Sequence, residues 1–146
     1  MNIYKTPNNG FCPGEIVNGR KVILTGHACE RAVERLSAMG IRYKDTEDYY
    51  ETALNIVNNA ITNPFMDKYL DNMFIHNKNH KVICHDTRTK MVFVIAINIE
   101  ENAIYGITFG EERNKKWVSN VDTGRMCWIY PDAFKFSTMN GNITWI

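Results

Sequence analysis

The chain has 146 residues, of which 45% are hydrophobic and 23% charged, as in one ordinary globular domain, and we expect a single domain over residues 1–146. The formal net charge is only +1, so any binding to nucleic acid must come from a local basic patch. No apolar run approaches the length of a membrane span and no signal-peptide pattern opens the chain. We therefore expect a cytoplasmic protein with no membrane partner.

The first segments predict an irregular arm and then a β-hairpin. Residues 1–14 are rich in turn-forming residues and show no periodicity, so we expect an arm there. Residues 15–24 contain two short apolar runs separated by Asn18-Gly19, a pair that suits the positive φ angles of a type I′ turn. The second of these predicted strands leads through Thr25-Gly26 into a helical pattern.

The predicted helix from residue 27 to 39 carries a stripe of basic side chains. We expect Thr25 to cap the start of this helix and Gly40 to end it in the left-handed conformation. His27, Arg31 and Arg35 are four residues apart, so they form a line along the shoulder of the apolar face. Packing does not require such groups, and in this position they suit the binding of a phosphate.

A plainer interpretation of the same stripe is open. Arg31 and Arg35 are also expected to pair with carboxylates on a solvated surface if the stripe has no ligand. The nearby acids are Glu30, Glu34 and Asp48.

The middle of the chain predicts a second helix and an antiparallel meander. The helix is expected to begin near residues 45–46 and to end at Asn63-Pro64, because a residue before proline avoids helical angles, with one more short turn at 65–70. Strand-like runs follow at 81–85, 91–98 and 103–109, joined by short connections. The run at 91–97 is almost entirely apolar and is expected to be the central strand.

The last part of the chain, residues 111–146, predicts a β-rich extension. It contains aromatic fragments and a hairpin signal at Asn140-Gly141. We therefore expect three parts within the one domain: the arm at 1–14, a core at 15–110 and this extension.

The segment Thr-Gly-His27-Ala-Cys-Glu-Arg31-Ala-Val-Glu-Arg35, with Gly40-Ile41 and Asn63-Pro64 after it, resembles a family of small ribonucleases. It is similar to the RelE/BrnT-like ribonuclease toxin superfamily, and its motif is closest to the phage RegB-type endoribonucleases, over residues 22 to 110. The resemblance implies an α+β fold in which two N-terminal helices pack on an antiparallel β-meander. It also implies an endoribonuclease that acts on RNA, in particular mRNA, without a metal or other cofactor.

Residues 76–90 form a second candidate patch, with several basic side chains and three of the four histidines. Cleavage of RNA needs a base for the 2′-hydroxyl, an acid for the leaving oxygen and cations for the charged phosphate, and histidine suits both proton roles. We therefore expect His27, Arg31, Arg35 and His85 to be catalytic. The expected RNA-binding residues are Lys78, His80, Lys81, Arg88, Thr108 and Arg113. The alternative is a hydrophilic hairpin whose charges are merely solvated.

Two details of this site follow from the strand period. Tyr105 and Thr108 are three apart, so we expect them on opposite faces of their strand, and only one of them can join the site. His76, His80, Cys84 and His85 are zinc-ligand types, but their spacing matches no compact zinc site, and a strand sends Cys84 and His85 to opposite faces. We therefore expect no metal.

One departure from the family leaves a rival function open. RegB-type enzymes are expected to use a second histidine in their helical region, where this chain has Asn58, Asn59 and Asn63. The rival is a phage-type interaction protein that inhibits or sequesters a host protein without catalysis. Its contact surface would be the aromatic C-terminal segment with Trp117, Trp128 and Trp145, because such residues often anchor interfaces.

Overall fold

The computed structural model describes residues 1–146 except 6–9, 63, 77–79, 87–90, 112–124, 130–133, 139–142 and 146. The described part of the chain is mixed α+β. Its helices are α1 (Gly26–Ala38), α2 (Thr46–Ile61) and α3 (Pro64–Ile75). Its strands are β1 (Asn2–Lys5), β2 (Phe11–Val17), β3 (Arg20–Leu24), β4 (His80–Asp86), β5 (Met91–Asn98), β6 (Ala103–Glu111), β7 (Arg125–Ile129), β8 (Phe134–Thr138) and β9 (Ile143–Trp145).

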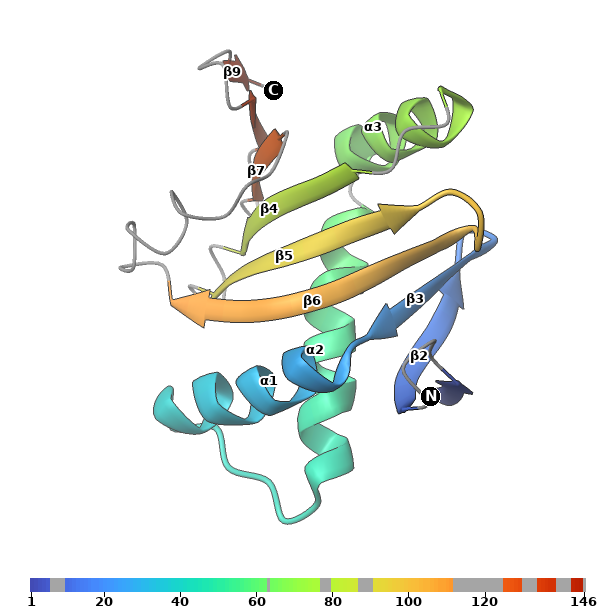
Figure 1. Cartoon of the computed structure of the whole chain (residues 1–146). Coiled ribbons are helices and arrows are strands. Elements are labelled where there is room, and N and C mark those ends of the chain that lie inside the picture. The colour runs from blue at the N-terminus through green and yellow to red at the C-terminus, as the bar shows by residue number, and fades with distance from the viewer. Residues whose placement is uncertain are drawn as a thin grey trace.

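The strands form one sheet in the order β1-β2-β3-β6-β5-β4-β7-β8-β9, which puts β5 at its centre (Figure 1). The meander of β4, β5 and β6 is antiparallel, as predicted. The sheet as a whole is mixed, however, because β3 pairs in parallel with β6 and β4 pairs in parallel with β7. The parallel pair β3–β6 needs a long crossover, and α1, α2 and α3 all lie within that connection.

The predicted hairpin is confirmed, and the predicted arm is wrong in part. Asn18 and Gly19 have φ angles of 51° and 79°, so the turn between β2 and β3 has the left-handed backbone that Asn-Gly favours. Residues 2–5 and 11–14, expected to be irregular, instead belong to β1 and β2, which pair antiparallel. Partners from a neighbouring strand order this segment, and local periodicity does not reveal them.

Two of the three helices begin where the sequence predicts. The side chain of Thr25 accepts a hydrogen bond from the backbone N–H of Ala28 at 3.1 Å, and Gly40 has a φ of 87° just past the end of α1. Asp45 precedes α2 at its N-cap position, and α2 ends at Ile61. The short turn expected at 65–70 is a helix of 12 residues that begins at Pro64, where the missing N–H costs no hydrogen bond.

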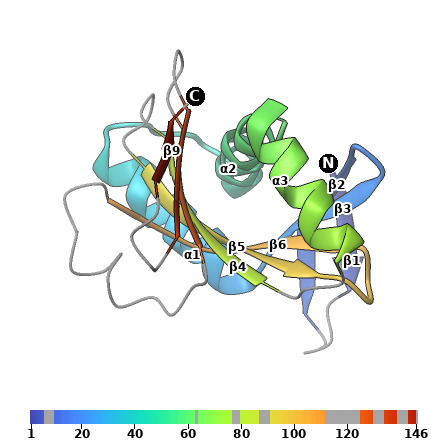
Figure 2. The same cartoon turned by 90° about the horizontal axis from the view of Figure 1, so that it is seen from above.

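Both α2 and α3 cover one face of the sheet, as Figure 2 shows. The core lies between them and the strands. It includes Leu36 of α1 and Val57 of α2, both fully buried, together with Phe93 and Phe109 of the sheet. We call the opposite face, turned away from α2 and α3, the outer face. No helix in the described part of the chain is both long and apolar enough to cross a membrane.

The central strand β5 is buried on both faces, as its apolar sequence predicts. Phe93 and Ile95 belong to the core, whereas Val92 and Val94 point the other way and are 0% and 2% exposed.

A β-bulge changes which residues of β6 share the outer face. Thr108 pairs with Val94 and Tyr105 pairs with Ala96, and the register shifts by one residue between these pairs. Cross-strand partners lie on the same face of a sheet. Tyr105 and Thr108 therefore both lie on the outer face, and the expectation of opposite faces is wrong because the bulge inserts one extra residue.

Candidate functional site

The helix α1 continues from the end of β3 alongside the second half of β6 (Figure 1). Thr25 joins the start of α1 to β6. Its backbone N–H donates to the Gly106 carbonyl at 3.0 Å, and its hydroxyl donates to the Ile107 carbonyl at 3.2 Å. A helix of 13 residues rises about 18 Å, close to the length of five strand steps. The helix therefore spans the stretch of β6 from Ile107 to Glu111, beyond Gly106, which is the last residue that pairs with β3.

One shoulder of α1 faces α2. The hydroxyl of Ser37 donates to that of Tyr49 at 3.3 Å. Burial, together with the neighbouring Cys29 and Glu30, raises the pKa of Tyr50 above its usual value, which puts these α1 residues close to α2.

The basic stripe lies on the other shoulder of α1. At about 100° per residue, His27, Arg31 and Arg35 are separated from Ser37 and Glu30 by the buried face of the helix. Because α2 covers the inner face of the sheet, the stripe is turned toward the outer face. This is the face on which Thr108 lies.

The three stripe residues differ in exposure and in partners. His27 is exposed in the first turn of α1, and this turn contains no acidic residue. Arg31 donates to Glu34 at 2.9 Å, with 41% of its side chain exposed, so the plainer interpretation holds for this residue in the absence of a ligand. Arg35 is half-buried.

Within residues 76–90, the predicted site residues that the structure describes lie near the two ends of β4. His85 pairs with Val92, which in turn pairs with Gly110, and this rung is at the end of the sheet beside α1. His80 pairs with Ile97 near the opposite end, and Lys81 follows it. Five strand steps separate His80 from His85, about 17 Å. They therefore cannot act on the same phosphate.

Three of the predicted RNA-binding residues, Lys78, Arg88 and Arg113, lie outside the described residues. Thr108 is half-buried on the outer face. The predicted residues that the structure brings to one end and one face are therefore His27, Arg31, Arg35 and Thr108, with His85 on a nearby rung.

Cys84 behaves as a core residue. It is fully buried, pairs with Phe93, and burial raises the pKa of its thiol. Because Phe93 belongs to the core face of β5, this pairing places Cys84 on the same face.

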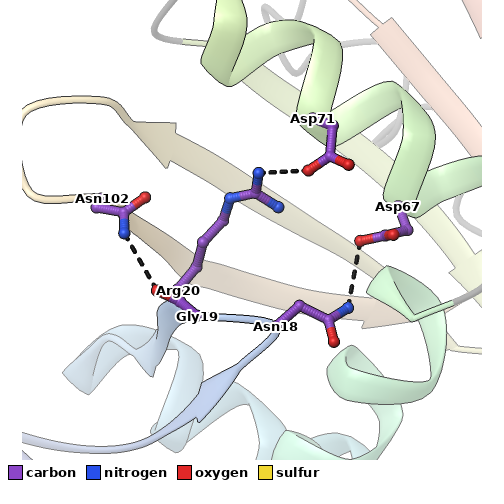
Figure 3. Close-up of polar contacts among 6 residues, drawn as sticks. All are labelled: Asn18, Gly19, Arg20, Asp67, Asp71 and Asn102. Atoms are coloured by element: carbon purple, nitrogen blue, oxygen red, sulfur yellow. Dashed lines mark hydrogen bonds and ion pairs between the residues drawn. The ribbon is translucent and has the colours of Figure 1, made fainter.

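A polar cluster at the far end of the sheet was not predicted from the sequence. Figure 3 shows it between the β2–β3 turn, the β5–β6 turn and α3. Arg20 donates to Asp71 at 2.5 Å and stacks on the Phe74 ring, and Asn18 donates to Asp67 at 3.2 Å. Asp67 and Asp71 are four residues apart, but this spacing is informative only once residues 64–75 are known to be helical. These contacts join the β2–β3 turn to α3, so we assign the cluster to holding α3 in place.

Comparison of the chain with protein-family models, with curated proteins and with solved structures gives no match. The resemblance to RelE/BrnT-like and RegB-type ribonucleases therefore rests on the sequence motif of α1 and the segments that follow it.

Proposed function

We infer that the outer face beside α1 binds RNA and that the protein is a metal-independent endoribonuclease. The observation that carries this function is the orientation of the basic stripe. His27, Arg31 and Arg35 occupy the shoulder of α1 opposite the one that contacts α2, on the same side as Thr108. A helix that only needed to pack would not require an aligned imidazole and two guanidinium groups there.

The chemistry assigns a role to each group. Arg31 and Arg35 bind the scissile phosphate, because a guanidinium donates two parallel hydrogen bonds to its oxygens. His27 transfers a proton, either from the attacking 2′-hydroxyl or to the leaving 5′-oxygen. The amino-terminal end of α1 adds a positive dipole that no acid of its first turn offsets. His85 is the candidate for the second proton transfer.

The direct test is incubation of the purified protein with total RNA in EDTA, followed by mapping of the new ends. Attack by the 2′-hydroxyl leaves a 2′,3′-cyclic phosphate and a 5′-hydroxyl, and these ends are the expected result. Arg31→Lys should slow cleavage, because a point charge does not reproduce a bidentate contact. Cleavage that stops in EDTA, or ends that carry a 5′-phosphate, would contradict the proposed mechanism.

An interaction protein is the second candidate, and a different surface favours it. Phe11 is 71% exposed and Ile3 is 58% exposed, and they lie on β2 and β1 at one edge of the described sheet. They share a face, because Ile3 pairs with Pro13, which is two residues from Phe11. Exposed apolar residues that gather at a sheet edge are typical of protein contacts. If Phe11→Ser abolishes capture of a host protein while RNA stays intact, this candidate is favoured over the ribonuclease. Trp117, Trp128 and Trp145, the anchors expected from the sequence, have no described side chains.

A further inference from the structure

The loop between α1 and α2 presents an aromatic ring that is held in a fixed position. Tyr43 is 39% exposed. Its hydroxyl is 2.9 Å from that of Thr52, and its backbone N–H donates to the hydroxyl of Tyr49 at 3.1 Å. Its ring meets the ring of Tyr49 edge-on, with centroids 5.0 Å apart and an interplanar angle of 78°. Both ends of Tyr43 are thus tied to α2, although the residue lies in a loop.

The network behind this ring reaches Ser37 in the last turn of α1, on the shoulder that contacts α2. The Tyr49 hydroxyl also accepts from Ser37, and its pKa is lowered by that bond, by the N–H of Tyr43 and by the positive charge of Arg42. Arg42 is therefore close to the aromatic pair. The loop is connected to α1 by Gly40, so it begins one turn beyond Arg35.

The charges around Tyr43 are of both signs. Arg42 and Lys44 flank it in sequence and are exposed. The exposed acids Asp45, Glu47 and Asp48 follow at the start of α2. Because these charges nearly cancel, the loop has little net attraction for a phosphate backbone. A ligand at Tyr43 must therefore be held mainly through a planar, uncharged ring of its own.

We propose that Tyr43 is a stacking platform for an unpaired base of the RNA, at a point beyond the carboxyl-terminal end of α1 where the RNA has left the basic stripe. This inference rests on the proposed function. Base–aromatic stacking is strong and tolerant of sequence, and a ring that is already fixed loses little conformational freedom when a base binds. A base in a duplex is stacked on its neighbours and would not reach the ring.

The test uses a short unstructured 2′-O-methyl RNA that contains 2-aminopurine, since this RNA has no free 2′-hydroxyl and stays uncleaved. Binding should quench the 2-aminopurine fluorescence through stacking. Tyr43→Ala and Tyr43→Leu should abolish the quenching and weaken binding by about 5- to 150-fold, whereas Tyr43→Phe should retain both. Phe11→Ala is the matched control, because it removes another exposed aromatic ring, and it should have no effect.

Salt dependence separates this inference from the proposed function. Stacking releases no counterions, so Tyr43→Ala should leave the slope of log affinity against log salt unchanged, whereas Arg35→Ala should reduce it. Binding by the wild type with no effect of Tyr43→Ala and Tyr43→Leu would overturn the stacking role alone. No binding by the wild type would overturn both proposals. Melting temperatures of each variant show that the fold is intact.

Discussion

At the level of single residues, Arg31 has one observed partner and one proposed ligand, and it cannot bind both at once. It donates to Glu34 at 2.9 Å, and the same guanidinium is assigned to the RNA phosphate. An exposed pair at this spacing contributes little stability, about 0 to 1 kcal/mol, so a phosphate with its full negative charge can displace the carboxylate. In the proposed complex, the displaced carboxylate of Glu34 would repel the RNA phosphate.

This competition predicts that Glu34→Gln tightens RNA binding. Removing the carboxylate frees Arg31 and removes a repelling charge, so affinity should rise severalfold and the salt slope should become steeper by up to about one phosphate contact. The measurement is a binding titration over a range of salt concentrations. Glu100→Gln, which removes an exposed carboxylate from the β5–β6 turn, is the control and should bind like the wild type. Equal effects of the two substitutions would show that only net charge matters.

At the level of secondary-structure elements, two glycines let neighbouring segments approach closely. A Cβ at Gly14 would lie 2.6 Å from the backbone carbonyl of Val22 and 2.8 Å from the Tyr4 ring. A Cβ at Gly106 would lie 2.7 Å from Leu24, at the far end of its side chain. A methyl group on either glycine would clash with its neighbours. At Gly14 the clash is with the backbone carbonyl of Val22, which cannot move without shifting β3.

Gly14→Ala should therefore lower the free energy of unfolding more than Gly106→Ala. We expect about 3 kcal/mol or more for Gly14→Ala and about 1 to 2 kcal/mol for Gly106→Ala, the range of overpacked cores. Denaturant unfolding of the two variants measures this difference. The reverse order would mean that Leu24 is held more tightly than the strand backbone.

The cluster in Figure 3 makes a second prediction for an element, the helix α3. Arg20, only 16% exposed, makes an ion pair with Asp71, whereas Asp67 accepts from the neutral Asn18. A charge-assisted bond is the stronger of the two, so Asp71→Asn should destabilise by about 1 kcal/mol and Asp67→Asn by less. Amide hydrogen exchange should become faster in α3 before the rest of the chain. Uniform acceleration over the sheet would contradict a local role.

The helices and strands that the sequence predicted correctly are those with local signals. Thr25 and Gly40 delimit α1, and Asn18-Gly19 makes the hairpin turn. The missed features depend on distant partners. The β1–β2 pairing, the parallel contact of β3 with β6 and the bulge at residues 106–108 are interactions between segments, and a window of neighbouring residues does not contain them.

At the level of the whole molecule, the order of the strands decides which predicted site residues meet. The stripe on α1 could be predicted from residue spacing alone, because it lies within one helix. The basic stretch at 76–90 could not be placed in this way. Its described part includes β4, in which His80 and Lys81 lie near one end and His85 near the other. Cleavage is therefore expected to depend on the end beside α1 and to be insensitive to the opposite end.

The most direct measurement is the rate of RNA cleavage in EDTA by His27→Ala, compared with wild type and with His76→Ala. Both histidines are exposed, but His76 follows α3 and lies far from α1 in sequence and structure. Loss of a general acid or base typically costs about 10² to 10⁴ in rate, so His27→Ala should fall by that factor while His76→Ala cleaves normally and both keep the wild-type melting temperature. Normal cleavage by His27→Ala, or equal losses in the two variants, would contradict the assignment of the site to α1.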